Sequence, residues 1–168
     1  MITAVTLGIA LAFEGEDNNI MQRAPRGIDE PILNGVLVWQ IIFVTILFVA
    51  AIFGIYSLGV EEDPSIEHAQ TLALNTLVFM EIFYLFYIRN HNTIKVGWRD
   101  MLGTKVVWTA VGVVFLAQLA ITYLPFMHSV FKTAPLSLYD FGLILAAGIV
   151  MLAILEIEKQ WRLRRKRS

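Results

Sequence analysis

The sequence predicts an all-α membrane helix bundle, with four full transmembrane helices preceded by a truncated N-terminal helix. Of its 168 residues, 57% are hydrophobic and only 16% are charged, whereas a soluble domain is nearer half and a quarter. The mean hydropathy is +0.66. The apolar residues gather in blocks long enough to cross a bilayer, and the positive charges fall between alternate blocks.

The first apolar block, residues 1–13, is uncharged and is followed by Glu14, Glu16 and Asp17. As a helix it would measure about 20 Å, whereas the hydrocarbon core of a bilayer is about 30 Å thick. The block also lacks the basic residues that open a signal peptide. We therefore expect a partial helix, either cut or incompletely embedded in the membrane.

Longer spans follow at about 36–58, 69–88, 106–124 and 136–157. An acidic cluster that contains Pro64 separates the first span from the second, because proline interrupts a helix. Pro125 is expected to end the third span, and a short link leads to the last one. We interpret residues 1–168 as one membrane domain built from these elements.

The distribution of lysine and arginine predicts the orientation in the membrane. If the C-terminus is cytoplasmic, the inner segments hold 12 of the 13 basic residues and only Lys132 lies outside. Cytoplasmic loops are enriched in basic residues, so this orientation is strongly favoured. Tryptophans and tyrosines, which prefer membrane interfaces, agree with it. The predicted inner group is Trp39, Trp98, Trp108 and Trp161, and the outer group is Tyr56, Tyr123 and Tyr139.

The chain ends in a basic run, and its members are Arg162, Arg164, Arg165, Lys166 and Arg167. Such a run could bind nucleic acid, but directly after a membrane span it is typical of a topology anchor that attracts anionic lipid. We therefore expect the lipid bilayer as a partner and no nucleic acid. The location predicted is the plasma (inner) membrane, with several passes and a cytoplasmic C-terminus.

Glu81 is the one acidic residue well inside a span. A carboxylate in the membrane is costly, and such residues are by default functional. No basic residue lies at a matching depth, so Glu81 must be protonated, hydrated or bound to a cation. We favour ion or proton handling. The alternative is a protonated carboxyl that is hydrogen-bonded within the bundle.

The other polar and small residues of the spans are expected to be structural. Polar side chains such as Asn75, Thr76, Gln118 and Thr122 are typical of contacts between helices. Glycines within spans allow helices to approach closely, and we expect this of Gly54, Gly112, Gly142 and Gly148.

Few residues suggest chemistry of other kinds. The chain has no cysteine, and its histidines His68, His91 and His128 are far apart in sequence, so we expect no metal site built from them. Glu81 is the candidate metal ligand. There is no glycine-rich phosphate loop, and no segment is long enough to fold as a soluble domain. We expect no catalytic residue and no cofactor in this chain.

Several strings resemble type II P-type cation ATPases. Residues 1–14 followed by residues 20–26 are similar to the sixth transmembrane helix and its loop, which carries Ile-Met-x-Arg-Pro-Pro-Arg. Ala24 stands here at the first proline. Residues 71–81 are similar to the eighth helix of the calcium pumps, where a glutamate at the place of Glu81 helps to bind calcium. Residues 156–159 resemble the end of the tenth helix, and the loop after Arg89 resembles bacterial members.

The resemblance implies the C-terminal membrane part of a cation pump. It would form the supporting helix bundle and part of the ion-site wall, with Glu81 as an ion ligand and Thr3 as a supporting residue. Ala4 stands where the family usually has an aspartate, which leaves calcium, a proton or another cation as the transported ion. The remaining domains of the pump would be partners. They would use ATP and Mg, and this chain alone would hydrolyse no ATP.

Two alternatives give Glu81 a role without the rest of a pump. One is a self-standing small membrane transporter, since small multidrug exporters also combine four spans with one buried glutamate. Those proteins are shorter, however, and carry the glutamate in their first span. The other alternative is a membrane regulatory subunit that associates with a separate pump.

Overall fold

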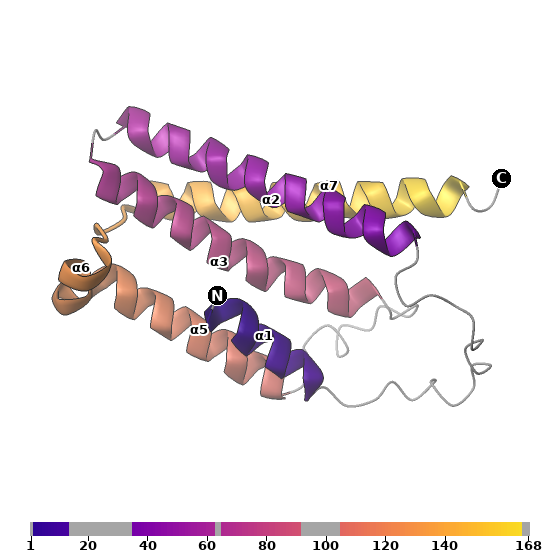
Figure 1. The fold of residues 1–168 in the computed structure, drawn as a ribbon, viewed down its shortest axis with the longest axis horizontal. Coiled ribbons are helices and arrows are strands. Elements are labelled where there is room, and N and C mark those ends of the chain that lie inside the picture. Colours follow the sequence, from indigo (N-terminus) through magenta and orange to yellow (C-terminus); the bar gives the residue numbers. More distant parts are fainter. Residues whose placement is uncertain (1, 14–34, 63–64, 92–104, 166–168) are drawn as a thin grey trace.

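The structure, a computed structural model, describes residues 2–13, 35–62, 65–91 and 105–165. These residues form six helices: α1 (Ile2–Ala12), α2 (Gly35–Glu62), α3 (Ile66–His91), α5 (Lys105–Tyr123), α6 (Pro125–Phe131) and α7 (Leu138–Arg165). No strand occurs in these described ranges. The long helices lie side by side in one elongated bundle (Figure 1). The predicted all-α class is confirmed.

The predicted number of full spans is also confirmed. Among the described helices, four are long and apolar enough to cross a membrane, and α1 is a shorter apolar helix. The helices α2 and α7 have 28 residues each, or about 42 Å, which exceeds a bilayer core of about 30 Å. Large apolar side chains such as Phe53 and Leu116 are exposed on the bundle, as expected of surfaces that face lipid or other membrane helices.

The spans alternate in direction and give the bundle two distinct ends. At one end lie the C-terminus of α2, the N-terminus of α3, helix α6 and the N-terminus of α7 (Figure 1, left). We call this the α6 end and the opposite one the tail end. Trp39, Trp108 and Trp161 lie at the tail end, and Tyr123 and Tyr139 lie at the α6 end. The predicted grouping of these aromatics holds, and Trp98 lies outside the described residues.

The link between the last two spans contains a helix that the sequence did not predict. Pro125 ends the preceding span as expected, but it is also the first residue of α6, a position that suits proline because no backbone N–H is needed there. Lys132 follows α6 with a φ of 51°, the left-handed conformation in which many helices end. The link is then held to α5, because Thr133 Oγ1 donates to the Ile121 carbonyl over 2.8 Å.

Helix α3 is the central element. It packs against α1, α2, α5 and α7. Of the residues in its most apolar stretch, 44% are buried inside the bundle, whereas only 6% of those in the corresponding stretch of α2 are buried. One apolar cluster joins α3 to α1 and α5, and two others join it to α2 and α7. Their buried members are Leu7, Val78, Leu85, Val107 and Val114, then Val44, Met80, Tyr87, Met151 and Leu155, then Ile55, Leu72, Leu136 and Ile144.

Close approach of helices at glycine occurs at fewer places than the sequence suggested. A Cβ on Gly148 would overlap the ring of Phe83, so α7 and α3 need a glycine there. The expectation is wrong for Gly54, Gly112 and Gly142, which have nothing within 4 Å of an added Cβ. Gly59 was not predicted, yet an added Cβ would lie 3.1 Å from the Cα of Ala69. It lies in the last turn of α2, where α2 and α3 meet at the α6 end.

Candidate ion site and its polar neighbours

Glu81 lies in the interior of α3, about 22 Å along the helix from Ile66. Its side chain is partly buried, and its Oε2 is enclosed with no hydrogen-bond partner among the described residues. A buried charge without a partner is strongly disfavoured. This oxygen therefore needs a proton, a water molecule or a cation.

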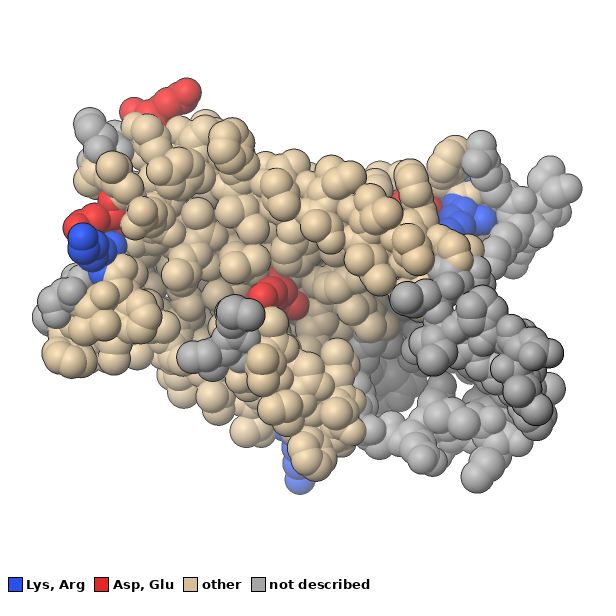
Figure 2. All heavy atoms as spheres, in the orientation of Figure 1, with Lys and Arg blue, Asp and Glu red and all other residues tan. Residues whose placement is uncertain are grey.

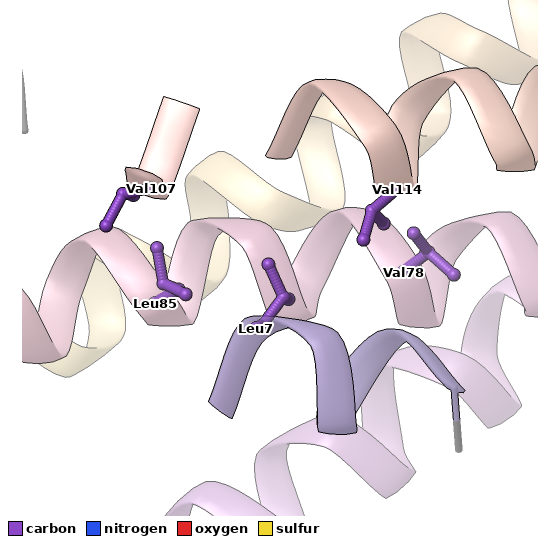
Figure 3. Packing of buried hydrophobic residues seen from close by; sticks show 5 residues of the cluster. All are labelled: Leu7, Val78, Leu85, Val107 and Val114. Carbon is purple, nitrogen blue, oxygen red and sulfur yellow. The ribbon is translucent and has the colours of Figure 1, made fainter. Parts of the chain in front are cut away.

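The short helix α1 lies beside Glu81. Leu7 of α1 packs with Val78 and Leu85, which flank Glu81 by about one turn on either side, and Figure 3 shows these side chains converging. Thr3 precedes Leu7 by one turn and so shares the face of α1 that packs on α3. Thr3 is partly buried, whereas Ala4 is exposed. No hydrogen bond joins the described side chains of Thr3 and Glu81.

A row of buried polar residues, which we call the polar seam, lies between α3 and α5. It comprises Thr71, Asn75, Gln118 and Thr122, each exposed by 4% or less. Asn75 Nδ2 donates to Thr122 Oγ1 over 3.2 Å and to the carbonyl of Thr71 over 2.9 Å. The expected contact between helices is thus confirmed for Asn75 and Thr122. Gln118 Nε2 is buried without a partner among the described residues.

Other threonines of the spans bond within their own helix. Thr45, Thr76 and Thr109 each donate a hydroxyl hydrogen bond of 2.8 Å to the carbonyl four residues earlier. Such bonds satisfy the hydroxyl proton within the helix. Among the described residues these three threonines make no hydrogen bond to another helix, contrary to the expectation for Thr76.

A histidine–carboxylate pair at the α6 end was not predicted. His68 Nε2 of α3 lies 3.1 Å from Asp140 Oδ2 of α7, and Asp140 is only 2% exposed. The same Oδ2 accepts a 2.7 Å hydrogen bond from the backbone N–H of Ser137. Only the separate polar characters of the two residues were visible in the sequence, which places them 72 positions apart.

The structure offers no larger ligand cluster. Among the described residues, no group of three or more His, Cys, Asp or Glu side chains could hold a metal ion. The side chains of His91 and His128 lie outside the described ones. A complete cation site at Glu81 would therefore need ligands other than a cluster of acidic and histidine side chains in the described part of the chain.

The basic tail extends α7 beyond its apolar part. Lys159 lies 3.7 Å from Glu156, and Arg162 lies 3.6 Å from Glu158. Arg164 is exposed, whereas the side chain of Arg165 and all of Lys166 and Arg167 lie outside the described residues. Figure 2 shows basic atoms at this end of a body that is mostly uncharged, with acidic atoms also visible part-way along it. The predicted role in binding anionic lipid stays a prediction.

Comparisons with known proteins identify the family of the chain. Residues 1–161 match the family model of the cation transporting ATPase C-terminus. The chain is 39% identical to the probable cation-transporting ATPase F of Mycobacterium tuberculosis over 139 residues, covering 82% of this chain and 15% of that protein. It is 28% identical over 159 residues to the cation-transporting ATPase pma1 of Synechocystis, covering 92% of this chain and 18% of the relative.

A third relative is the calcium-transporting ATPase 1 of Saccharomyces cerevisiae, 26% identical over 153 residues, which are 90% of this chain and 16% of that protein. The chain thus spans less than a fifth of the length of these relatives. The match runs through all four spans and includes α1. The chain belongs to the family of C-terminal membrane domains of the cation-transporting ATPases.

Proposed function

We propose that this chain is the supporting helix bundle of a P-type cation pump and that Glu81 forms part of the wall of its ion site. The observation that carries the proposal is the enclosed Oε2 of Glu81, which has no hydrogen-bond partner among the described residues. It lies inside a helix long and apolar enough to span a membrane. A cation or a proton from the transported pool would satisfy this oxygen.

The surroundings of Glu81 suit a rigid wall. Helix α3 is held on its other sides by apolar clusters shared with α2 and α7, so Glu81 is carried by the most buried helix of the bundle. Thr3 of α1 contributes a hydroxyl on the adjoining face. Further ligands come from other parts of the pump, because the described residues form no cluster of three or more acidic or histidine side chains.

The chemistry of ATP belongs to the rest of the pump. ATP and Mg²⁺ act in the remaining domains, and the present chain supplies no catalytic residue to them. In this proposal the chain alone hydrolyses no ATP. The self-standing transporter and the regulatory subunit are disfavoured, because the family match covers residues 1–161 and the relatives are named as whole ATPases.

The orientation proposed places the tail end in the cytoplasm and the α6 end outside. The described part of the tail end contains Lys159, Arg162 and Arg164, whereas the described α6 end contains the single basic residue Lys132. The location proposed is the plasma (inner) membrane, and the C-terminus is cytoplasmic in this proposal because basic residues flank spans on the cytoplasmic side.

The test is Glu81→Gln in a complete pump that carries residues 1–168, assayed for cation-stimulated ATP hydrolysis. Loss of a charged ligand should raise the cation concentration for half-maximal activity about tenfold or more, equivalent to about 1.4 kcal/mol. Glu67→Gln is the matched control, because Glu67 is an exposed acid on the same helix. Unchanged cation affinity and turnover in Glu81→Gln would show that Glu81 is not part of the ion site.

A further inference from the structure

Helix α6 turns its large apolar side chains outward instead of burying them. Phe126, Val130 and Phe131 are exposed by 71%, 58% and 53%, although the helix has only seven residues. Phe126 and Val130 are four positions apart, so they lie on one face of the helix. A helix on the surface of a soluble protein directs such a face into the core. An exposed apolar face of this kind marks a surface that an apolar partner covers.

The chain on both sides of α6 holds this helix against the end of α5. The last residue of α5 is Tyr123, and Leu124 alone separates it from α6. After α6 the link is bonded back to α5, because Thr133 Oγ1 donates to the carbonyl of Ile121. The hydroxyl of Tyr123 also donates to the carbonyl of Leu136 over 3.2 Å. Helix α6 therefore stays beside the end of α5 (Figure 1).

The end of α5 lies at the border between the hydrocarbon core and the headgroups of a bilayer. Helix α5 has 19 residues and measures about 28 Å, which matches a hydrocarbon core of about 30 Å. Glu61 and Glu67, at the same end of the bundle, are exposed acids that need water. Tyr123 and Tyr139 also lie at this end, and tyrosine gathers at membrane interfaces. Helix α6 is therefore held in the interfacial layer.

An exposed apolar stripe of α5 ends beside α6. Leu116, Tyr123 and Leu124 are exposed, and their spacing of seven and eight residues places them on one face of α5. Apolar surface of this kind on a membrane span suits contact with lipid. Phe126 follows Leu124 after Pro125 alone, so the exposed face of α6 adjoins a surface that already suits lipid.

The chain turns at Lys132 directly after α6. Lys132 is exposed and has a φ of 51°, the left-handed conformation in which many helices end. A lysine at a membrane interface lays its carbon stem along apolar surface and keeps its ammonium group in the polar layer. The phosphate oxygens of lipid headgroups are the anionic groups of that layer. Large apolar side chains beside a basic residue are typical of helices that lie in the interface.

We propose that α6 is an interfacial anchor, with Phe126 and Val130 inserted in the leaflet on the α6 side and Lys132 directed to a lipid phosphate. The partner is lipid and not a second membrane helix, because contacts between membrane helices favour small residues and α6 presents large ones. The anchor holds the end of α5 at a fixed depth. It goes beyond the proposed ion-site role and depends on neither Glu81 nor the transported ion.

The first experiment measures the environment of α6 with spin labels in a complete pump that carries residues 1–168. This chain has no cysteine, so Phe126→Cys and Val130→Cys are made in a pump whose other cysteines are replaced. In phospholipid vesicles, each label should collide several-fold more often with oxygen, which concentrates in hydrocarbon, than with an uncharged, water-soluble nickel chelate. Glu67→Cys is the matched control, because Glu67 is exposed at the same end, and its label should show the reverse preference.

Two results at positions 126 and 130 would overturn the proposal. Frequent collisions with the nickel chelate would place α6 in water. Few collisions with either reagent, together with an immobilised label, would show that protein covers α6. Oxygen-rich collisions at both positions support insertion in lipid.

The second experiment tests the contact of Lys132 with headgroups. In vesicles that contain phosphatidylglycerol, Lys132→Glu should raise nickel collisions of the label at position 130 several-fold, because a carboxylate repels the phosphates and draws α6 toward water. Lys105→Glu is the matched control, since Lys105 is an exposed lysine at the opposite end of α5, and it should leave this label unchanged. An equal effect of the two substitutions, or none from Lys132→Glu, would refute the headgroup contact.

Discussion

His68 of α3 and Asp140 of α7 meet at the α6 end, with 3.1 Å between Nε2 and Oδ2. Asp140 has a second role, because its Oδ2 accepts the backbone N–H of Ser137 while its own N–H donates to Ser137 Oγ over 3.2 Å. This reciprocal arrangement is a helix N-cap of the capping-box type. One carboxylate therefore both starts α7 and ties it to α3, the helix that carries Glu81.

Asp140→Ala should lower the free energy of unfolding in detergent micelles or bilayers by about 1 to 3 kcal/mol. The substitution removes the carboxylate half of the capping box and leaves the His68 ring without its acceptor, and a buried group that loses its partner costs about this much. His68→Ala should cost less, because the hydrogen bond from the Ser137 N–H to the Asp140 carboxylate survives. Denaturant titration followed by tryptophan fluorescence measures both.

Tyr139→Phe is the control for this pair, since Tyr139 is adjacent to Asp140 but 62% exposed, and it should change stability little. The double substitution of His68 and Asp140 should cost less than the sum of the single ones, because contacting residues couple. Strict additivity would mean that the pair contributes nothing to joining α3 and α7.

The contact of Asn75 with Thr122 should contribute a modest coupling energy between α3 and α5. Hydrogen bonds between membrane helices average about 0.6 kcal/mol in double-mutant cycles, and we expect a similar value from Asn75→Ala combined with Thr122→Val. Unfolding of the four forms in bilayers measures it. A coupling energy of zero would indicate that each helix satisfies its own polar group, as Thr76 already does through the carbonyl of Leu72.

The spans could be predicted from the sequence because a membrane helix is encoded locally. About 20 apolar residues in a row are sufficient evidence, and Glu81 stands out because it interrupts one such run. The candidate ion ligand Glu81 could therefore be predicted from the local sequence pattern alone. The surroundings of Glu81 could not be predicted, since the sequence does not tell which helix faces it. The structure identifies α1 as its neighbour through the packing of Leu7 with Val78 and Leu85.

Features that depend on pairing between distant residues could not be predicted. His68 and Asp140 are 72 positions apart, and each looked like an isolated polar residue at the end of a span. Glycine spacing likewise does not reveal which glycine meets a neighbour, because that depends on how helices rotate about their axes. Helix α6 was missed since its seven residues are too few for a periodic pattern, although Pro125 is a common first residue of a helix.

The proposed orientation is testable because the chain contains no cysteine. Single cysteines at Glu61 and Arg164, both exposed and at opposite ends of the bundle, should react with a membrane-impermeant maleimide from opposite sides. In intact cells the reagent should label position 61, and position 164 should react only after the membrane is opened. Labelling of position 164 in intact cells would reverse the orientation, and labelling of both would contradict the alternation of spans.

Gly148→Ala should destabilise the bundle, whereas Gly142→Ala on the same helix should not. A Cβ at position 148 would overlap the ring of Phe83, while a Cβ at position 142 has nothing within 4 Å. Overpacking of a tight contact costs about 1 to 3 kcal/mol, and alanine at an unhindered helix position gains about 0.5 to 1 kcal/mol over glycine. The two variants, compared by thermal unfolding in bilayers, should therefore shift stability in opposite directions. Phe83→Leu should relieve the cost of Gly148→Ala, because it removes the obstructing ring, and no such rescue would mean that α7 and α3 do not approach at this residue.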